Sequence, residues 1–259
     1  SRLGTKSSIP QPYRQATAGR WCGVGPIHLQ TVCREARTVA LWGSYLFDIE
    51  ACHYALFAQM ADRLGLDTPM IRQLLADKKE FREFVAREAE LSVADTKWVL
   101  TSFIYGAKLN ASYRTSISQE LGQGTVERLR EIAEVQGLLN DINRARKPII
   151  RDYDSRSGPG WLCNDLRRNT RQKGSPQRVL LSHLLQGAEA QMLTAVGHAH
   201  GKDIQLLLHD GWVMKRPVEP GDLENLIRTQ TGWNVRISVE KLGFKESVWM
   251  PRNRYDDIF

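Results

Sequence analysis

The stretch SYLFDIEACHYALFAQMA, residues 44–61, decides the fold of this protein. Its first residues belong to the apolar segment 41–48 (LWGSYLFD), whose length and composition predict a short strand that ends in a carboxylate. Residues 50–64 follow with the spacing of a helix buried on one side, and Gly65 is a stop signal. Asp48 therefore lies where a strand gives way to a helix, a position that exposes a side chain at a sheet edge.

A second carboxylate lies at a similar place near the other end of the chain. Residues 204–216 (IQLLLHDGWVMKR) predict a strand, a tight turn and a second strand, with Asp210 at the tip. Two aspartates converging on one sheet edge make an oxygen-rich site of the kind that magnesium prefers. A pair of ions about 3.5–4 Å apart can activate an attacking oxygen and stabilise a leaving one. Either aspartate alone is better explained as a cap or turn residue.

The rest of the chain predicts an α+β protein with a helical insertion in its middle. Residues 1–40 are rich in Pro, Gly, Ser and Arg and predict irregular structure. The remaining predictions are helices at 69–90 (one or a pair), from Ser92 to Gly106, at 125–146, at 177–198 and at 222–230, a basic loop or hairpin at 154–176, and a last strand at 235–242.

The charge of the chain fits a nucleic-acid binder and a merely basic soluble protein about equally. The formal net charge is +7 and the isoelectric point is near 9.3, which is typical of nucleic-acid binders. No apolar run approaches the ~18 residues that a membrane span needs. The four cysteines form no C-x-x-C pair, which favours reduced thiols in a cytosolic protein. The sequence begins at Ser1, which indicates processing or a piece of a longer protein.

The predicted helix from Ser92 carries Lys97, Thr101 and Tyr105 at intervals of four, so the three residues share one stripe. The lysine could meet phosphates as a point charge, and the tyrosine could stack or pack near a base. The alternative is a core helix whose lysine extends to water.

Five segments resemble, in the family's order, motifs of the family A DNA polymerases, and together they extend from Thr17 to Arg216. They are ATAGRWCGVGPIHLQ (16–30), SYLFDIEACHYALFAQMA (44–61), KWVLTSFIYG (97–106), RVLLSHLLQGAEAQML (178–193) and LLLHDGWVMKR (206–216). The resemblance implies a polymerase palm, an antiparallel sheet with helices, interrupted by mainly helical fingers. The implied parts are palm at 1–61, fingers at 62–175 and palm at 176–259, without a thumb.

The resemblance also implies a role for each matching residue. Asp48, Asp210 and the backbone carbonyl of Ile49 would hold two Mg²⁺ ions. Lys97 would hold the incoming nucleoside triphosphate, and Tyr105 would lie by the templating base. His53 would lie beneath the incoming sugar, and Thr101 would line the sugar pocket. Contacts to primer or template would come from Arg20, Gln30, Arg178, Ser182, Gln186 and His209.

Five positions depart from the family pattern. The sequence has Val93 for an arginine of the triphosphate site, Thr101 for an aromatic residue, His53 for a glutamate, Ser182 for an asparagine and Gly211 for the last glutamate of motif C. The changes at His53 and Gly211 point toward single-subunit phage-type RNA polymerases. The G-R segment close before motif A and the Q-G segment point back to DNA polymerases.

The resulting prediction is a DNA-directed DNA polymerase that acts in DNA replication and extends a primer on a primer-template. A bacterial or phage-infected cytoplasm is the expected compartment. The thumb and exonuclease-like regions would lie upstream or on another chain, and no membrane is involved. Three alternatives remain: a phage-type RNA polymerase fragment, a catalytically degenerate nucleic-acid-binding module, and a basic helical protein with accidental matches. The last alternative predicts that Asp48 and Asp210 lie far apart.

Overall fold

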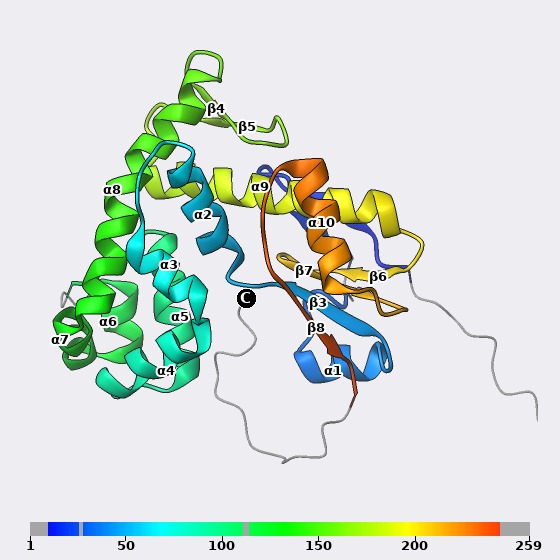
Figure 1. Cartoon of the computed structure of the whole chain (residues 1–259), viewed down its shortest axis with the longest axis horizontal. Helices are drawn as coiled ribbons and strands as arrows, with labels where there is room; N and C mark the ends of the chain where they lie inside the picture. The colour runs from blue at the N-terminus through cyan, green and yellow to red at the C-terminus, as the bar shows by residue number, and fades with distance from the viewer. Residues whose placement is uncertain (1–9, 26–27, 111–113, 244–259) are drawn as a thin grey trace, which may run out of the picture.

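The computed structural model describes residues 10–25, 28–110 and 114–243 (Figure 1). A four-stranded antiparallel sheet in the order β6-β7-β3-β8 lies beside a group of helices from the middle of the sequence. The strands of this sheet are β3 (Tyr45–Ile49), β6 (Ile204–Leu207), β7 (Gly211–Met214) and β8 (Ile237–Lys241). The predicted α+β class is confirmed, as are the strands expected around the two aspartates.

The pleat of β3 and β7 divides their side chains between two apolar clusters. Phe47, Ile49 and Trp212 are fully buried in the main core, where the rings of Phe47 and Trp212 stack at a centroid distance of 5.7 Å. Leu46 and Val213, one residue away on each strand, belong to a small cluster on the opposite face. Both faces are covered because successive side chains of a strand point to opposite sides.

Two helices cover the main face of the sheet. They are α9 (Gln177–His200) and α10 (Pro220–Thr231), which pack against each other and against β6 and β8 respectively. On the other face lies α1 (Arg34–Ala40), as Figure 1 shows. The sheet is therefore enclosed by a helical layer on its main face, while its edge near Asp48 faces the helical group.

The helical group follows β3 in the chain. Its members are α2 (Cys52–Asp62), α3 (Pro69–Ala76), α4 (Lys78–Glu88), α5 (Val93–Ile104), α6 (Ser116–Leu121), α7 (Gln123–Glu131) and α8 (Ala133–Ser155). The prediction of a single helix at 125–146 is wrong, because Ile132 has an extended backbone (φ −78°, ψ 117°) that separates α7 from α8. None of the described helices combines the length and apolar character needed to cross a membrane.

Both ends of α5 are where the sequence predicts them. The Oγ atom of Ser92 accepts a hydrogen bond from the backbone N–H of Asp95 at 3.0 Å and donates to the Asp95 carboxylate at 2.6 Å. At the other end Gly106 has a φ of +85°, and its α-carbon packs so closely on α9 that a Cβ would lie 2.7 Å from the Cβ of Arg178. This approach joins the end of α5 to the start of α9.

The N-terminal segment is more ordered than the sequence predicts. Residues 1–40 were expected to be irregular, yet β1 (Tyr13–Gln15) pairs with β2 (Trp21–Gly23), and α1 follows. The hairpin is fixed to β6 by the hydroxyl of Tyr13, which accepts from the backbone N–H of Leu207 at 2.7 Å and donates to its carbonyl. Strands of three residues carry too little periodicity to be seen in the sequence.

The hairpin expected at 154–176 is present as β4 (Trp161–Cys163) and β5 (Asn169–Arg171). Asn164 in its turn donates to the carbonyls of Ala18 and His183 at 2.9 and 3.2 Å. The side chain of Asn164 lies directly over Gly187 of α9, where an added Cβ would lie 2.4 Å from its amide. A glycine is therefore required at this point of α9.

Two glycines of α9 give a matched test of this packing. Gly187→Ala should destabilise the protein by about 1–3 kcal/mol, because Asn164 must move and lose its hydrogen bonds. Gly197→Ala should instead stabilise it by up to about 1 kcal/mol, since nothing lies within 4 Å of the added methyl and alanine favours a helix. Urea unfolding of the two variants measures both effects, and equal effects would contradict the packing described.

Candidate active site

Of the two aspartates singled out in the sequence, Asp48 lies on β3 and Asp210 lies in the turn directly before the neighbouring strand β7. Asp48 is paired with Gly211 across β3 and β7, and the backbone N–H of Ile49 donates to the carbonyl of Asp210 at 2.9 Å. The strands approach so closely here that a Cβ at Gly211 would lie 2.4 Å from the carbonyl oxygen of Phe47. Glycine in place of the family's glutamate therefore fits the local backbone. The alternative of a basic helical protein with accidental matches predicted that the two aspartates lie far apart, and that prediction is wrong.

The electrostatics of the pair are those of crowded carboxylates. Partial burial and the negative charge of Asp210 raise the pKa of Asp48 to about 7. Burial and the charge of Glu189 likewise raise the pKa of Asp210. Both aspartates nevertheless remain exposed at the surface, so an ion from solvent can reach them. A bound cation would offset the repulsion that raises both pKa values.

Three basic side chains from the helical group act electrostatically on Asp48. The charges of Lys78 and Lys97 lower the pKa of Asp48 against the effects of burial, and burial lowers the pKa of Arg82 while Asp48 opposes that shift. Lys78 on α4 also forms an ion pair of 3.0 Å with Glu50. The sequence reasoning identified Lys97 and missed Lys78 and Arg82. Their spacing of four on an amphipathic helix was the available signal.

The donor set fits magnesium better than a softer metal. Asp48 and Asp210 offer hard carboxylate oxygens, and the carbonyl of Ile49 belongs to the same strand end. Among the described residues a second group, Cys52, His53 and Glu189, brings three ligand types within 4.8 Å. That group does not fit a cation, because the guanidinium of Arg20 already occupies both oxygens of Glu189.

Behind the aspartates lies a buried network centred on Glu189 of α9, whose side chain is 1% exposed. Arg20 donates to both of its carboxylate oxygens at 2.7 Å. His53 contacts the same carboxylate through Nε2 at 2.8 Å, and its Nδ1 lies 2.5 Å from the hydroxyl of Tyr105. Because a carboxylate can only accept, Nε2 of His53 carries the hydrogen and Nδ1 is left to accept from Tyr105.

The network keeps a negative charge inside the protein. Burial opposes ionisation of Glu189, but the hydrogen bonds from His53 and Arg20 and the positive charge of Arg20 outweigh it and lower its pKa. Burial raises the pKa of Tyr105 to about 12, which keeps its hydroxyl a donor. The network thus joins the N-terminal hairpin region, α2, the end of α5 and α9. Glu189 at its centre was not among the site residues that the sequence predicted.

Two of the residues expected to bind nucleic acid have their side chains engaged within the protein. Gln30 accepts from the backbone N–H of Gly23 at 2.7 Å and donates to the carbonyls of Trp21 and Leu207 at 2.8 and 3.2 Å. Arg20 is held by Glu189, with 19% of its side chain exposed. Both residues therefore have a clear structural role beside any contact with a ligand.

The other expected residues lie nearer the surface. Arg178, Ser182 and Gln186 recur every four residues along α9, so they lie along one side of it, where Gln186 donates to the hydroxyl of Ser182 at 2.9 Å. Burial and the positive charge of Arg20 lower the pKa of His209, beside Asp210 in the turn. Thr101 is partly exposed on α5, between Lys97 and Tyr105.

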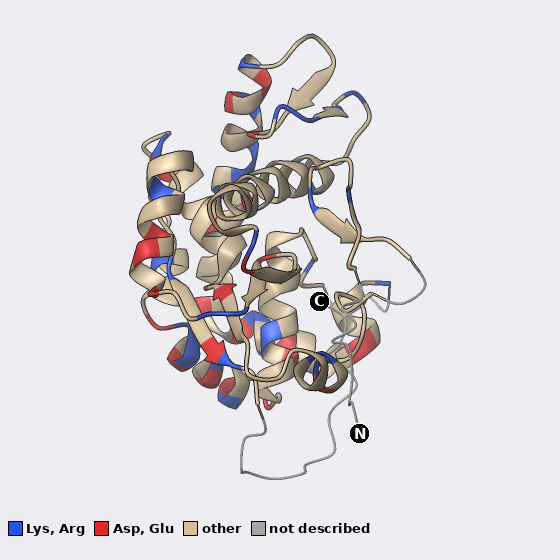
Figure 2. Ribbon diagram, turned by 90° about the vertical axis from the view of Figure 1, so that its right-hand side faces the viewer, with Lys and Arg blue, Asp and Glu red and all other residues tan. Residues whose placement is uncertain are grey.

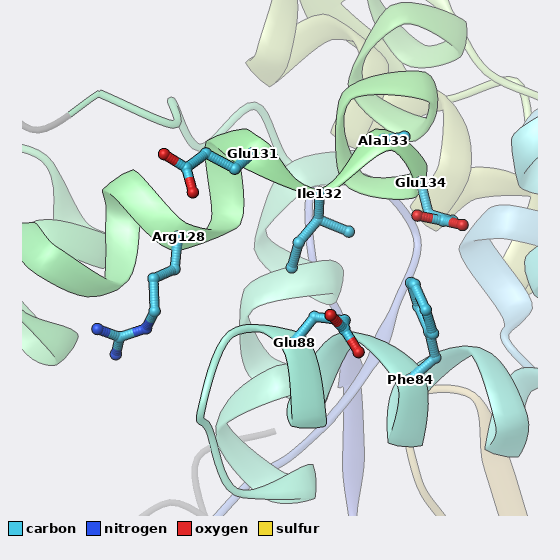
Figure 3. A pocket seen from close by; sticks show the side chains of 7 residues that line it. All are labelled: Phe84, Glu88, Arg128, Glu131, Ile132, Ala133 and Glu134. Carbon is cyan, nitrogen blue, oxygen red and sulfur yellow. The ribbon is translucent and has the colours of Figure 1, made fainter.

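An open hollow of about 360 Å³ lies elsewhere, between α4, α7 and α8. Its lining residues are Phe84, Glu88, Arg128, Glu131, Ile132, Ala133 and Glu134 (Figure 3). Three of these are glutamates, and Arg128 is held by the carbonyl of Ala89 at 2.9 Å and by Glu90 at 3.8 Å. Such a surface repels phosphates, so this hollow is a poor candidate for a nucleotide site.

No family model and no curated protein matches this sequence. Among solved structures, the chain is similar to the POL domain of Pol1 from M. smegmatis in complex with DNA primer-template and dNTP. The TM-score is 0.58 at 16% sequence identity, over 88% of this chain and 46% of that chain. The chain therefore spans about half the length of this neighbour and has a polymerase-like fold.

Proposed function

We propose that this protein is a template-directed nucleotidyl transferase, a DNA-directed DNA polymerase resembling family A. The carrying observation is the pairing of Asp48 with Gly211, which sets Asp48 on β3 beside Asp210 in the turn before β7, where the charges of Lys78, Arg82 and Lys97 act on Asp48. Anionic ligands that bind through a divalent cation, as nucleoside triphosphates do, need this combination of carboxylates and facing cations. The complex of the structural neighbour with primer-template and dNTP supports the same class of ligand.

The proposed reaction joins the 3′-hydroxyl of a primer to the α-phosphate of the incoming nucleotide. A new bond forms between the primer oxygen and the α-phosphorus, and the bond from the α-phosphorus to the oxygen that bridges it to the β-phosphorus breaks. The hydroxyl proton passes to solvent, and pyrophosphate leaves. Bound Mg²⁺ would supply charge to both the attacking and the leaving oxygen, and Asp48 and Asp210, with the Ile49 carbonyl, would hold it. The remaining contribution of the protein is positioning and charge stabilisation.

The basic side chains of α4 and α5 are proposed to hold the triphosphate. Lys97 occupies the family's lysine position, while Val93 stands where the family has an arginine. Lys78 and Arg82 act on the same carboxylate from the neighbouring helix, so they offer replacement charges for that arginine. This arrangement favours an active enzyme over a catalytically degenerate module.

In this proposal residues 1–61 and 176–259 form the palm, and residues 62–175 form the fingers. The hydrogen bond between His53 and Tyr105 then joins the two parts beside the nucleotide site. His53 would border the incoming sugar, and Tyr105 the templating base. Arg178, Ser182 and Gln186 would contact the template or primer along α9.

Removal of either metal-binding carboxylate tests the function directly. Asp48→Asn and Asp210→Asn should each abolish Mg²⁺-dependent primer extension while leaving the fold intact, since each variant loses a ligand charge that no described neighbour replaces. Gel-resolved extension of a labelled primer with deoxynucleotides measures this, and Asp222→Asn in α10 is the control.

Primer extension at the normal rate by either variant would refute the two-metal assignment. Incorporation of ribonucleotides in place of deoxynucleotides would instead identify the phage-type RNA polymerase activity. No incorporation by the unaltered protein, with either Mg²⁺ or Mn²⁺, would leave only a nucleic-acid-binding module.

A second prediction concerns the triphosphate site. Lys97→Ala and Lys78→Ala should each raise the KM for deoxynucleotide by about tenfold, because a charged contact to phosphate is lost. Lys79→Ala is the matched control: it neighbours Lys78, its side chain is 83% exposed, and its ion-pair partner is Glu83. Steady-state kinetics at saturating primer-template separate KM from kcat. Equal KM values in all three variants would place Lys78 and Lys97 on an ordinary solvated surface.

A third prediction follows from the pKa of Asp48. Without divalent cations the folded protein binds a proton near pH 7 that the unfolded chain releases near its ordinary value of 3.8. Its free energy of unfolding should therefore fall as pH rises through this window, and Mg²⁺ should restore stability most at the upper end, where it no longer competes with the proton. Urea unfolding with chelator or Mg²⁺ measures this. The Asp48→Asn variant should show a weaker pH effect and less stabilisation by Mg²⁺.

A further inference from the structure

The β4–β5 hairpin presents one aromatic side chain to solvent for a structural reason. Trp161 is paired with Arg171 across the two strands, and Leu162 is paired with Thr170. Successive residues of a strand point to opposite faces, and Leu162 is fully buried in the main core. Trp161 is therefore directed outward on the same face as Arg171, and 49% of it is exposed.

A hollow on this face is formed by Trp161 and its neighbours. It has a volume of about 350 Å³ and is lined by Gly160, Trp161, Arg171 and Lys173. The backbone N–H of Gln172 donates to the carbonyl of Gly160 at 3.0 Å, which holds the two sides of the hairpin together below the hollow. An apolar ring surface thus lies beside two cationic side chains in a fixed frame.

The charge around this hollow is one-sided. Arg171 and Lys173 are exposed, and among the described residues neither forms an ion pair with a carboxylate. Residues 161–175 also include Arg167 and Arg168, and their one acidic residue, Asp165, accepts a hydrogen bond from the hydroxyl of Tyr153 at 3.0 Å. Figure 2 shows Lys and Arg on this hairpin, at the top of the molecule.

The hairpin is set apart from the two aspartates. Figures 1 and 2 both place it beyond α9, on the side of that helix away from the sheet. It connects α8 to α9, whose row of Arg178, Ser182 and Gln186, with Arg178 exposed and the other two partly exposed, begins just after β5. A strand of nucleic acid that follows α9 away from the aspartates would reach the hollow next.

We propose that this hollow binds single-stranded nucleic acid, with one base stacked on Trp161 and the flanking phosphates on Arg171 and Lys173. Stacking on an exposed aromatic ring beside cations is how proteins grip single strands without reading their sequence. The inference rests on the proposed function, under which the ligand is the unpaired template beyond the primer end.

The test compares two ligands with the full chain. Fluorescence anisotropy measures binding to a labelled primer-template with a 5′ overhang of about ten nucleotides and to the same duplex with blunt ends. Trp161→Ala should weaken binding to the overhang substrate by about tenfold and leave blunt-duplex binding within about twofold. Trp161→Tyr should retain most of the affinity and Trp161→Leu should not, because only an aromatic ring can stack.

Matched controls come from elsewhere on the surface. Trp42→Ala removes another tryptophan of similar exposure, 53%, and should leave overhang binding unchanged. Arg171→Ala and Lys173→Ala should each reduce the slope of log affinity against log salt by about 0.7, since each loses a phosphate contact. Arg130→Ala, an exposed cation on α7, should not change that slope.

Equal affinity of Trp161→Ala and the unaltered protein for the overhang would overturn the proposal. An equal loss on overhang and blunt substrates would overturn it as well, because the site would then not read the single strand. Primer extension is scored separately. If overhang binding depends on Trp161 while extension fails in the unaltered protein, the proposed polymerase activity falls and this binding site stands.

Discussion

The close pairing of β3 with β7 is the constraint on which the rest of the structure depends. Asp48 is paired with Gly211, and the N–H of Ile49 is bonded to the carbonyl of Asp210, so the strand register itself sets the two carboxylates side by side. A shift of one residue would turn Asp48 to the other face and bring Phe47 out of the core. The hydrophobic packing of Phe47 on Trp212 therefore protects the geometry of the site.

Glu189 provides the second organising interaction. A buried carboxylate is costly unless it is paired and hydrogen-bonded, and here Arg20 and His53 satisfy both oxygens. The same network reaches Tyr105 at the end of α5. Directly behind the aspartates, the network joins segments that are distant in sequence. It therefore fixes the helical group relative to the sheet at the proposed nucleotide site.

Two groups of basic side chains lie at the two proposed ligand sites. Lys78, Arg82 and Lys97 act on the carboxylate of Asp48, where their positive charge would attract a triphosphate. Arg171 and Lys173 lie on the hairpin beyond α9, where an aromatic ring is exposed beside them. One group of basic side chains therefore lies at the candidate active site, and another lies at the proposed single-strand site.

The sequence alone determined the elements that depend on local signals: the strand ending near Asp48, the hairpin at Asp210, and both ends of α5 through Ser92 and Gly106. Hydrophobic periodicity, capping and turn residues act over a few positions, so the elements that they define can be predicted from the sequence itself. Only the tertiary structure decided what Glu189, Lys78 and Arg82 face, and that Trp161 points outward. These contacts depend on strand register and on the packing of distant segments. The spacing of four places Lys78 and Arg82 on one side of a helix, but it does not say what that side meets.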